Sequence, residues 1–275
     1  MRRFSLLTAL LLAVFLAPLK AEAPAPTLIQ QAFDRMYDLD FAGAHRDLDG
    51  WQKLHPEDPL APASHAAAFL YSEFARLGIL ESELFVDDAI FEARKKPAPD
   101  PQLKKLFESA LSQSEDLAGK ILARNPSDTN AQFARVLAVG LRADYAALIE
   151  KRDLAAIRYT KQGRVLAEQL LKQKPDAYDA HLAVGIENYL SGIKPAPVRW
   201  ILQMGGVRTD KQQGLRDLEL TAAHPGLMAP FARLLLAVAA LRDKDNAKAC
   251  SLLNGLARQY PQNPLYRREL NRSHC

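Results

Sequence analysis

The sequence predicts an all-α protein built from helical hairpins, and two observations support this fold class. Apolar residues recur at helical spacing almost to the end of the chain, and stretches in which β-branched or aromatic residues alternate with polar ones are absent. Because a small residue lets two helices cross closely and proline ends a helix, a small residue at a fixed distance before a proline indicates the second helix of a hairpin. Four such pairs, each twelve positions apart, are Ala44 and Pro56, Ser114 and Pro126, Gly163 and Pro175, and Ala249 and Pro261.

Residues 1–23 have the layout of a secretory signal peptide. Arg2 and Arg3 precede an apolar run that ends in small residues. The run is shorter than the roughly 20 apolar residues that a membrane span needs, so a cleavable signal is favoured over an uncleaved anchor. We therefore expect export, to the periplasm or out of the cell, and a single mature domain over residues 24–275.

Composition agrees with a folded protein that has a sizeable core. Of the 275 residues, 48% are apolar, which is ample for a core. The formal charge of +4 falls to +2 when residues 1–23 leave, because they carry three basic side chains and one acidic one. A mildly basic protein needs no nucleic acid partner to account for its charge.

A hairpin is expected at each end of the array, and the last one is near-regular. The first is expected over residues 27–55, with a turn at Asp40 and Phe41, and the last over residues 227–260. A short charged helix over residues 265–271 follows. We expect it to cap the array, since a terminal repeat must cover its apolar neighbour while presenting polar residues to water.

Residues 178–192 carry a family resemblance. Val184, Gly185, Tyr189 and Gly192 stand where the tetratricopeptide repeat has Leu, Gly, Tyr and Gly, and the small residues and closing prolines also resemble that repeat. The resemblance implies an irregular, right-handed α-solenoid of about five helical hairpins. It also implies a concave groove that takes a peptide or helix of a protein partner. The positions that face this groove in the family correspond to Asp179, Leu182, Ile186 and Tyr189.

A second resemblance covers residues 178–220. The segment 205–218, which reads GGVRTDKQQGLRDL and follows an Asn-Tyr helix, is similar to part of the tetratricopeptide-39 and inclusion-body-clearance family. This similarity adds support for an irregular helical solenoid.

The spacing of the four prolines shows that the array contains insertions. They are separated by 70, 49 and 86 residues, whereas simple tandem repeats would give multiples of about 34. Three segments are the predicted insertions and account for the irregular distances between the prolines: residues 80–100, residues 145–163 and residues 193–210.

The last insertion contains the most unusual local sequence, over residues 194–204. Prolines at its start and glycines after its end isolate a short apolar segment. One interpretation is a wedge that contacts a partner or a membrane surface. The other is a short helix that lies in the groove of the solenoid. In the wedge, the apolar anchors are Trp200, Ile201 and Met204, and the cations that meet acidic groups are Lys194, Arg199 and Arg208.

Catalytic and metal-binding motifs are absent from the sequence. The six histidines have no recognised ligand spacing, and neither a Gly-x-Ser-x-Gly elbow nor a phosphate-binding Gly-Lys-Ser/Thr loop is present. We therefore expect no enzyme activity, metal or cofactor. Cys250 and Cys275 leave two alternatives open: a disulfide that holds the C-terminal tail against the last hairpin, or a buried Cys250 with a frayed Cys275.

Two functional hypotheses follow. The first is an exported, non-enzymatic scaffold that binds a peptide or helical segment of a cell-envelope protein. The alternative is a peripheral envelope protein that contacts lipid or a hydrophobic ligand through residues 194–204, and this membrane contact is the less favoured of the two.

Overall fold

The computed structural model describes residues 26–79, 95 and 98–275, and within them the regular structure is entirely helical, with no strand. The predicted all-α class is therefore confirmed. The predicted signal peptide and most of the insertion predicted over residues 80–100 lie outside the described residues.

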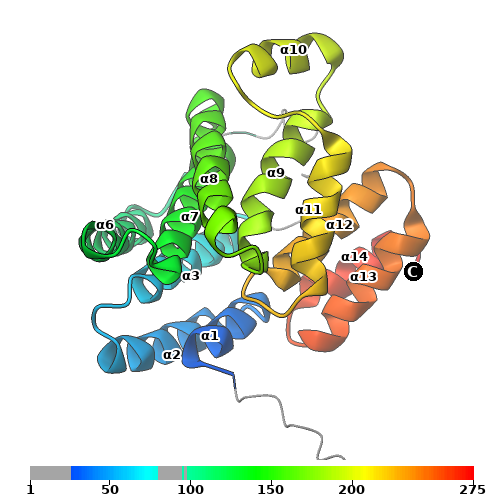
Figure 1. Ribbon diagram of the computed structural model, residues 1–275. Coiled ribbons are helices and arrows are strands. Elements are labelled where there is room, and N and C mark those ends of the chain that lie inside the picture. The colour runs from blue at the N-terminus through cyan, green and yellow to red at the C-terminus, as the bar shows by residue number, and fades with distance from the viewer. Residues whose placement is uncertain (1–25, 80–94, 96–97) are drawn as a thin grey trace, which may run out of the picture.

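Apart from α3 and α6, which are separated by residues 77–100, the helices follow one another with short connections (Figure 1). The first half of the described chain forms α1 (Leu28–Tyr37), α2 (Phe41–Leu54), α3 (Leu60–Arg76), α6 (Pro101–Arg124), α7 (Thr129–Asp144), the π-helix η1 (Tyr145–Ile149) and α8 (Asp153–Gln173). The second half forms the 3-10 helix η2 (Tyr178–Ala180), α9 (His181–Gly192), α10 (Ala196–Met204), α11 (Lys211–Ala223), α12 (Ala229–Arg242), α13 (Asn246–Gln259) and α14 (Pro264–Arg272).

The twelve-residue interval between a small residue and a proline correctly locates four of the helices. Helices α2, α6, α8 and α13 each end two residues before one of the four prolines. The small residues of the four pairs are all buried. Several of these helices and their neighbours begin at an aspartate whose carboxylate accepts a hydrogen bond from a backbone N–H of the first turn, as Asp128 does from Ala131 at α7. Local sequence therefore sets both ends of these elements.

Each helix packs on the next one along the chain, except that α9 packs mainly on α11 and α10 stands apart. The contact between α9 and α11 is the closest. A Cβ atom at Gly214 would collide with the backbone of Tyr189, and one at Gly185 would lie 3.0 Å from the Leu218 side chain. Gly185 and Gly214 therefore supply the two halves of this close approach.

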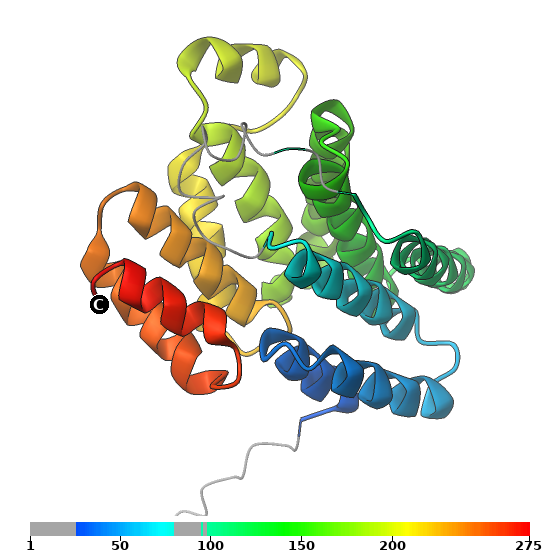
Figure 2. The same cartoon turned by 180° about the vertical axis from the view of Figure 1, so that it is seen from behind.

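The first helix also contacts the end of the chain, so that the array closes on itself (Figure 2). The Asp38 carboxylate accepts hydrogen bonds from the backbone N–H groups of Gln262 at 2.8 Å and Asn263 at 3.1 Å. The Asn263 side chain donates to the Tyr37 carbonyl at 2.8 Å, and the Tyr37 hydroxyl donates to the Leu227 carbonyl at 2.8 Å. A chain separation of more than 220 residues is bridged here by paired polar groups.

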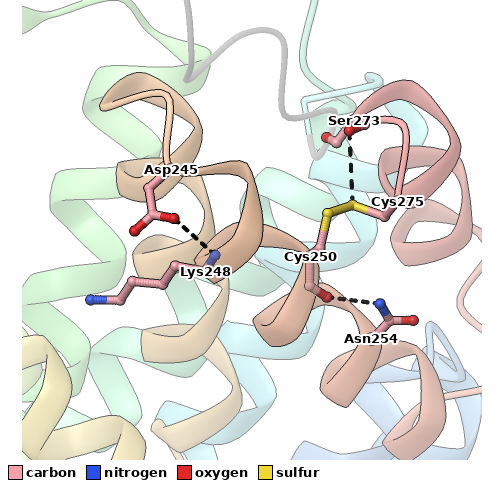
Figure 3. Close-up of a disulfide and its surroundings, with 6 residues drawn as sticks. All are labelled: Asp245, Lys248, Cys250, Asn254, Ser273 and Cys275. Atoms are coloured by element: carbon pink, nitrogen blue, oxygen red, sulfur yellow. Dashed lines mark hydrogen bonds between the residues drawn. A yellow bond between two sulfur atoms is a disulfide. The ribbon is translucent and has the colours of Figure 1, made fainter.

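A disulfide joins Cys250 of α13 to Cys275, with a distance of 5.6 Å between their Cα atoms (Figure 3). The structure therefore has the first of the two alternatives that the sequence left open. Helix α14 lies between the two cysteines in sequence and packs on α13. It buries Tyr266 and Glu269 and exposes Arg267 and Arg268, the distribution expected of a capping helix.

Removing the carboxylate that bridges the two ends is expected to destabilise the fold. The substitution Asp38→Ala takes away two charge-assisted hydrogen bonds from backbone donors, which corresponds to about 1–2 kcal/mol of unfolding free energy. Urea unfolding followed by circular dichroism measures the loss. Glu219→Ala is the matched control, because Glu219 makes only an exposed ion pair with Lys248 and its removal is expected to cost about 0.5 kcal/mol or less. Equal losses in the two variants would contradict the proposed importance of the Asp38 contacts.

Candidate functional site

A pocket of about 120 Å³ lies where α3, α7, α8, α9 and α12 face one another. Its walls are mainly apolar, with Leu137 and Leu141 from α7 and Leu182 and Ile186 from α9. Helices α3 and α12 are far apart in sequence, yet the rings of Tyr71 and Phe231 approach to 6.4 Å between centroids. The pocket therefore exists because the array curls until α12 faces α3.

The structure places the four residues predicted to face a groove in different surroundings. Leu182 and Ile186 do line the pocket. Tyr189 is only 4% exposed and packs in the core against α11, so it has no surface available to a partner. Its prediction as a groove residue does not agree with the structure, because the close contact at Gly214 turns this side of α9 toward α11 rather than toward the pocket.

Asp179 also lines the pocket, but its carboxylate is committed to the protein itself. It accepts hydrogen bonds from the backbone N–H groups of Leu227 at 2.9 Å and Met228 at 3.0 Å. Burial raises the pKa of this carboxyl above its usual value, and the two backbone hydrogen bonds oppose the rise. Asp179 thus fixes the start of α12, which brings Met228 and Phe231 to the pocket.

Asp144 is the polar group of the pocket that the sequence did not reveal. It is the last residue of α7, directly before the π-helix η1, and it makes no hydrogen bond or ion pair with the described residues. Burial raises the pKa of its carboxyl to about 7. π-Helical turns occur frequently at functional sites. The only sequence signal near Asp144 was the insertion predicted to begin at the next residue.

Aromatic side chains surround the same space. Tyr71, Phe133, Tyr159 and Phe231 line it from α3, α7, α8 and α12. Burial, followed by the nearby Asp144 carboxylate, raises the pKa of the Tyr71 phenol well above its usual value. The pocket therefore combines a partly buried carboxylate with aromatic and aliphatic walls.

The predicted wedge forms α10, which stands apart from the helical body (Figure 1) and contributes no residue to the pocket lining. None of its residues is buried, and the exposed fractions of Trp200, Ile201 and Met204 are 64%, 64% and 72%. The interpretation of this segment as a helix lying in the groove therefore does not agree with the structure. The apolar side chains predicted as anchors are open to solvent.

The base of α10 is held by charged groups of the helical body. Buried Arg164 and Glu187 form an ion pair at 2.8 Å between α8 and α9, and Glu187 also accepts a hydrogen bond from the backbone N–H of Arg208. Arg199, predicted to meet a partner, instead donates to the carbonyl of Lys194 at 3.2 Å and, more weakly, to that of Gly192. These contacts anchor the segment while leaving its apolar tip exposed.

The sequence analysis did not identify one further pair of side chains, His45 and His65. The Nδ1 atoms of His45 in α2 and His65 in α3 lie 2.7 Å apart, close enough for one ring to donate a hydrogen bond to the other. Burial, followed by the neighbouring His65, lowers the pKa of His45 to about 4. The two residues are twenty positions apart on different helices, so no spacing rule could have paired them.

In the part of the chain that the structure describes, no group of three or more His, Cys, Asp or Glu side chains is placed to hold a metal ion. Among those same residues, no helix has both the length and the apolar character needed to cross a membrane. Comparison of the whole chain with family models, curated proteins and solved structures gives no match in any of the three.

Asp144→Asn is expected to change how stability depends on pH. Because the pKa of Asp144 is raised in the folded state, the wild-type protein loses stability as pH rises from about 4 to about 7, and the variant does not. Each pKa unit corresponds to about 1.4 kcal/mol, and partial exposure to the pocket reduces the total to about 1–2 kcal/mol. Above pH 7, therefore, the variant should be the more stable protein.

Urea unfolding of both proteins at pH 4.5, 6 and 8 measures this difference. The lowered pKa of His45 has the opposite sign, since it removes stability as pH falls from about 6.5 toward 4, and it cancels because both proteins contain His45. Asp243→Asn, at an exposed carboxylate, is the control. A difference between wild type and Asp144→Asn that stays constant with pH would rule out a buried, titrating Asp144.

Proposed function

We propose that this is an exported, non-enzymatic binding protein of the tetratricopeptide-like solenoid type, and that its pocket holds a segment of a protein partner in the cell envelope. The observation that carries the proposal is the place of Leu182 and Ile186. Both were singled out as groove residues by the family resemblance, and both line the pocket. A concave apolar site with few polar groups is the usual form of a binding site.

The chemistry of the pocket favours binding over catalysis. Its lining residues include no cysteine, histidine, lysine or arginine. The Asp179 carboxylate is engaged by two backbone donors, and the Thr160 hydroxyl donates to the Ala156 carbonyl. No nucleophile and base in this lining stand within hydrogen-bond distance of each other, which is the arrangement that nucleophilic catalysis requires.

Two features support export. One is the signal-like sequence of residues 1–23. The other is the disulfide between Cys250 and Cys275, because such bonds form and persist in oxidising compartments such as the periplasm and the extracellular space.

Photo-crosslinking from the pocket tests the partner-binding function. With p-benzoylphenylalanine in place of Ile186, irradiation of the source cells is expected to give one predominant crosslinked protein. Gly140→Phe should abolish that product, since a Cβ atom at Gly140 meets no atom within 4 Å and the added ring would extend into the pocket.

Gly119→Phe is the matched control for this experiment, because Gly119 also has open space at its Cβ position but lies on α6, away from the pocket. The crosslink should persist in this variant. A crosslinked product that survives Gly140→Phe, or no product at all, would argue against partner binding in the pocket.

The exposed tip of α10 favours a second candidate function, contact with lipid. A short helix that presents Trp200, Ile201 and Met204 to solvent has the side chains that insert into the interfacial region of a bilayer. The same tip is also suited to a protein partner, as the sequence predicted.

Flotation with anionic liposomes at low salt distinguishes these two roles of α10. For lipid contact, we expect the wild-type protein to float and Trp200→Ala to reduce the floating fraction several-fold, since the indole supplies much of the apolar area. Leu154→Ala, at a still more exposed leucine on α8, should have no effect. Wild-type protein that stays at the bottom of the gradient would eliminate the lipid role.

A further inference from the structure

Within the described chain, the pocket contains a carboxylate without a counter-charge. Asp144 lines it and has no hydrogen-bond or ion-pair partner among the described residues, and none of the described residues of the lining is basic. Asp144 is partly buried, and a carboxylate partly removed from water is destabilised unless it is paired. Its presence in a mainly apolar pocket therefore points to a ligand that brings the missing positive charge.

The aromatic rings of the pocket favour the same ligand charge. Tyr71, Phe133, Tyr159 and Phe231 line the pocket from four different helices. The face of an aromatic ring attracts a cation, and groups of such rings are used to bind ammonium ions. The hydroxyl groups of Tyr71 and Tyr159 are hydrogen-bond acceptors, which an ammonium group with its three donors can use in addition to Asp144.

The size and the remaining walls limit the rest of the ligand. A cavity of about 150 Å³ lined by aliphatic and aromatic residues accommodates benzene. The pocket measures about 120 Å³, and Leu137, Leu182 and Ile186 make much of its surface apolar. One ring or a short alkyl chain is therefore the group that fits, whereas a whole helix is too large.

We propose that the pocket binds a protonated amine carried on a short apolar body, with the ammonium group at Asp144 and the apolar body among the aromatic and aliphatic walls. This inference rests on the proposed binding function of the pocket and adds the chemical class of the bound group. An ammonium group of this kind belongs either to a free organic amine or to a lysine side chain of a partner protein.

Binding of a cation at Asp144 is linked to pH. The titratable groups that share the lining with Asp144 are Tyr71 on α3, Tyr159 on α8 and Asp179 next to α9, while α12 contributes only the uncharged Met228 and Phe231. Since the pKa of Asp144 is about 7, its carboxyl is largely protonated at pH 5.5 and largely ionised at pH 8. An ammonium ligand prefers the ionised form, so its affinity should fall roughly tenfold or more between pH 8 and pH 5.5.

Titration of the full, disulfide-bonded chain with benzylammonium chloride at pH 8, followed by NMR, tests the inference. Benzyl alcohol is the neutral match of the same shape. We expect the amine to bind at least tenfold more tightly than the alcohol, and Asp144→Asn to remove this preference. Gly140→Phe should prevent the binding of both compounds, whereas Asp243→Asn and Gly119→Phe should bind them as the wild-type protein does.

A second arm identifies the source of the ammonium group. A capped pentapeptide with one lysine between apolar residues is compared with the same peptide containing norleucine. If the lysine peptide binds more tightly than benzylammonium and the norleucine peptide does not, the group belongs to a partner protein. If only the small amine binds, it belongs to a free amine.

The inference is overturned if neither small compound binds, if the amine and the alcohol bind equally well to the wild-type protein, or if Asp144→Asn leaves the preference for the amine unchanged. Should Asp144→Asn fail to fold, the fall in affinity of the wild-type protein at pH 5.5 decides the question. Amine binding without a crosslink from Ile186 would refute the protein partner alone. A crosslink without any preference for the amine would refute the ligand class alone.

Discussion

The contact between the first helix and the end of the chain is the constraint on which the rest of the structure depends. An array of helical hairpins is normally stabilised by contacts between neighbours alone, and its inner face stays open. Here Asp38 and Tyr37 bind the segment around Asn263 and the connection before α12, so the array closes. The inner face then becomes a pocket that α3, α7, α8, α9 and α12 line.

The same constraint explains why structural and recognition roles are mixed within one short stretch of sequence. Asp179 faces the pocket, yet it holds the backbone of Leu227 and Met228 in place. Leu182 and Ile186, one and two turns further along, are free to form the pocket wall. A groove in an open solenoid needs no hydrogen bonds like those of Asp179, because no distant helix has to be positioned opposite it.

The parts of the fold that depend on local sequence were predictable. The small residues, the closing prolines and the aspartate caps act within one or two turns of themselves, and they located α2, α6, α8 and α13 correctly. The pocket was only half predictable, through Leu182 and Ile186. Asp144, Tyr71 and Phe231 come together through the closure of the array, and His45 meets His65 across two helices. Contacts between distant segments produce no periodic pattern in a single sequence, so they could not be predicted from it.

The disulfide gives this closure a dependence on compartment. Cys250 and Cys275 enclose a loop of 25 residues that contains Tyr260 and Asn263, two of the residues that bind the first helix. Cross-linking a loop of this size restricts the unfolded chain by an amount that corresponds to about 3 kcal/mol. In a reducing cytoplasm the segment that completes the ring lacks this restriction, and the newly made chain is less firmly closed. Oxidation of the two thiols is then the step that adds this stabilisation to the closed array.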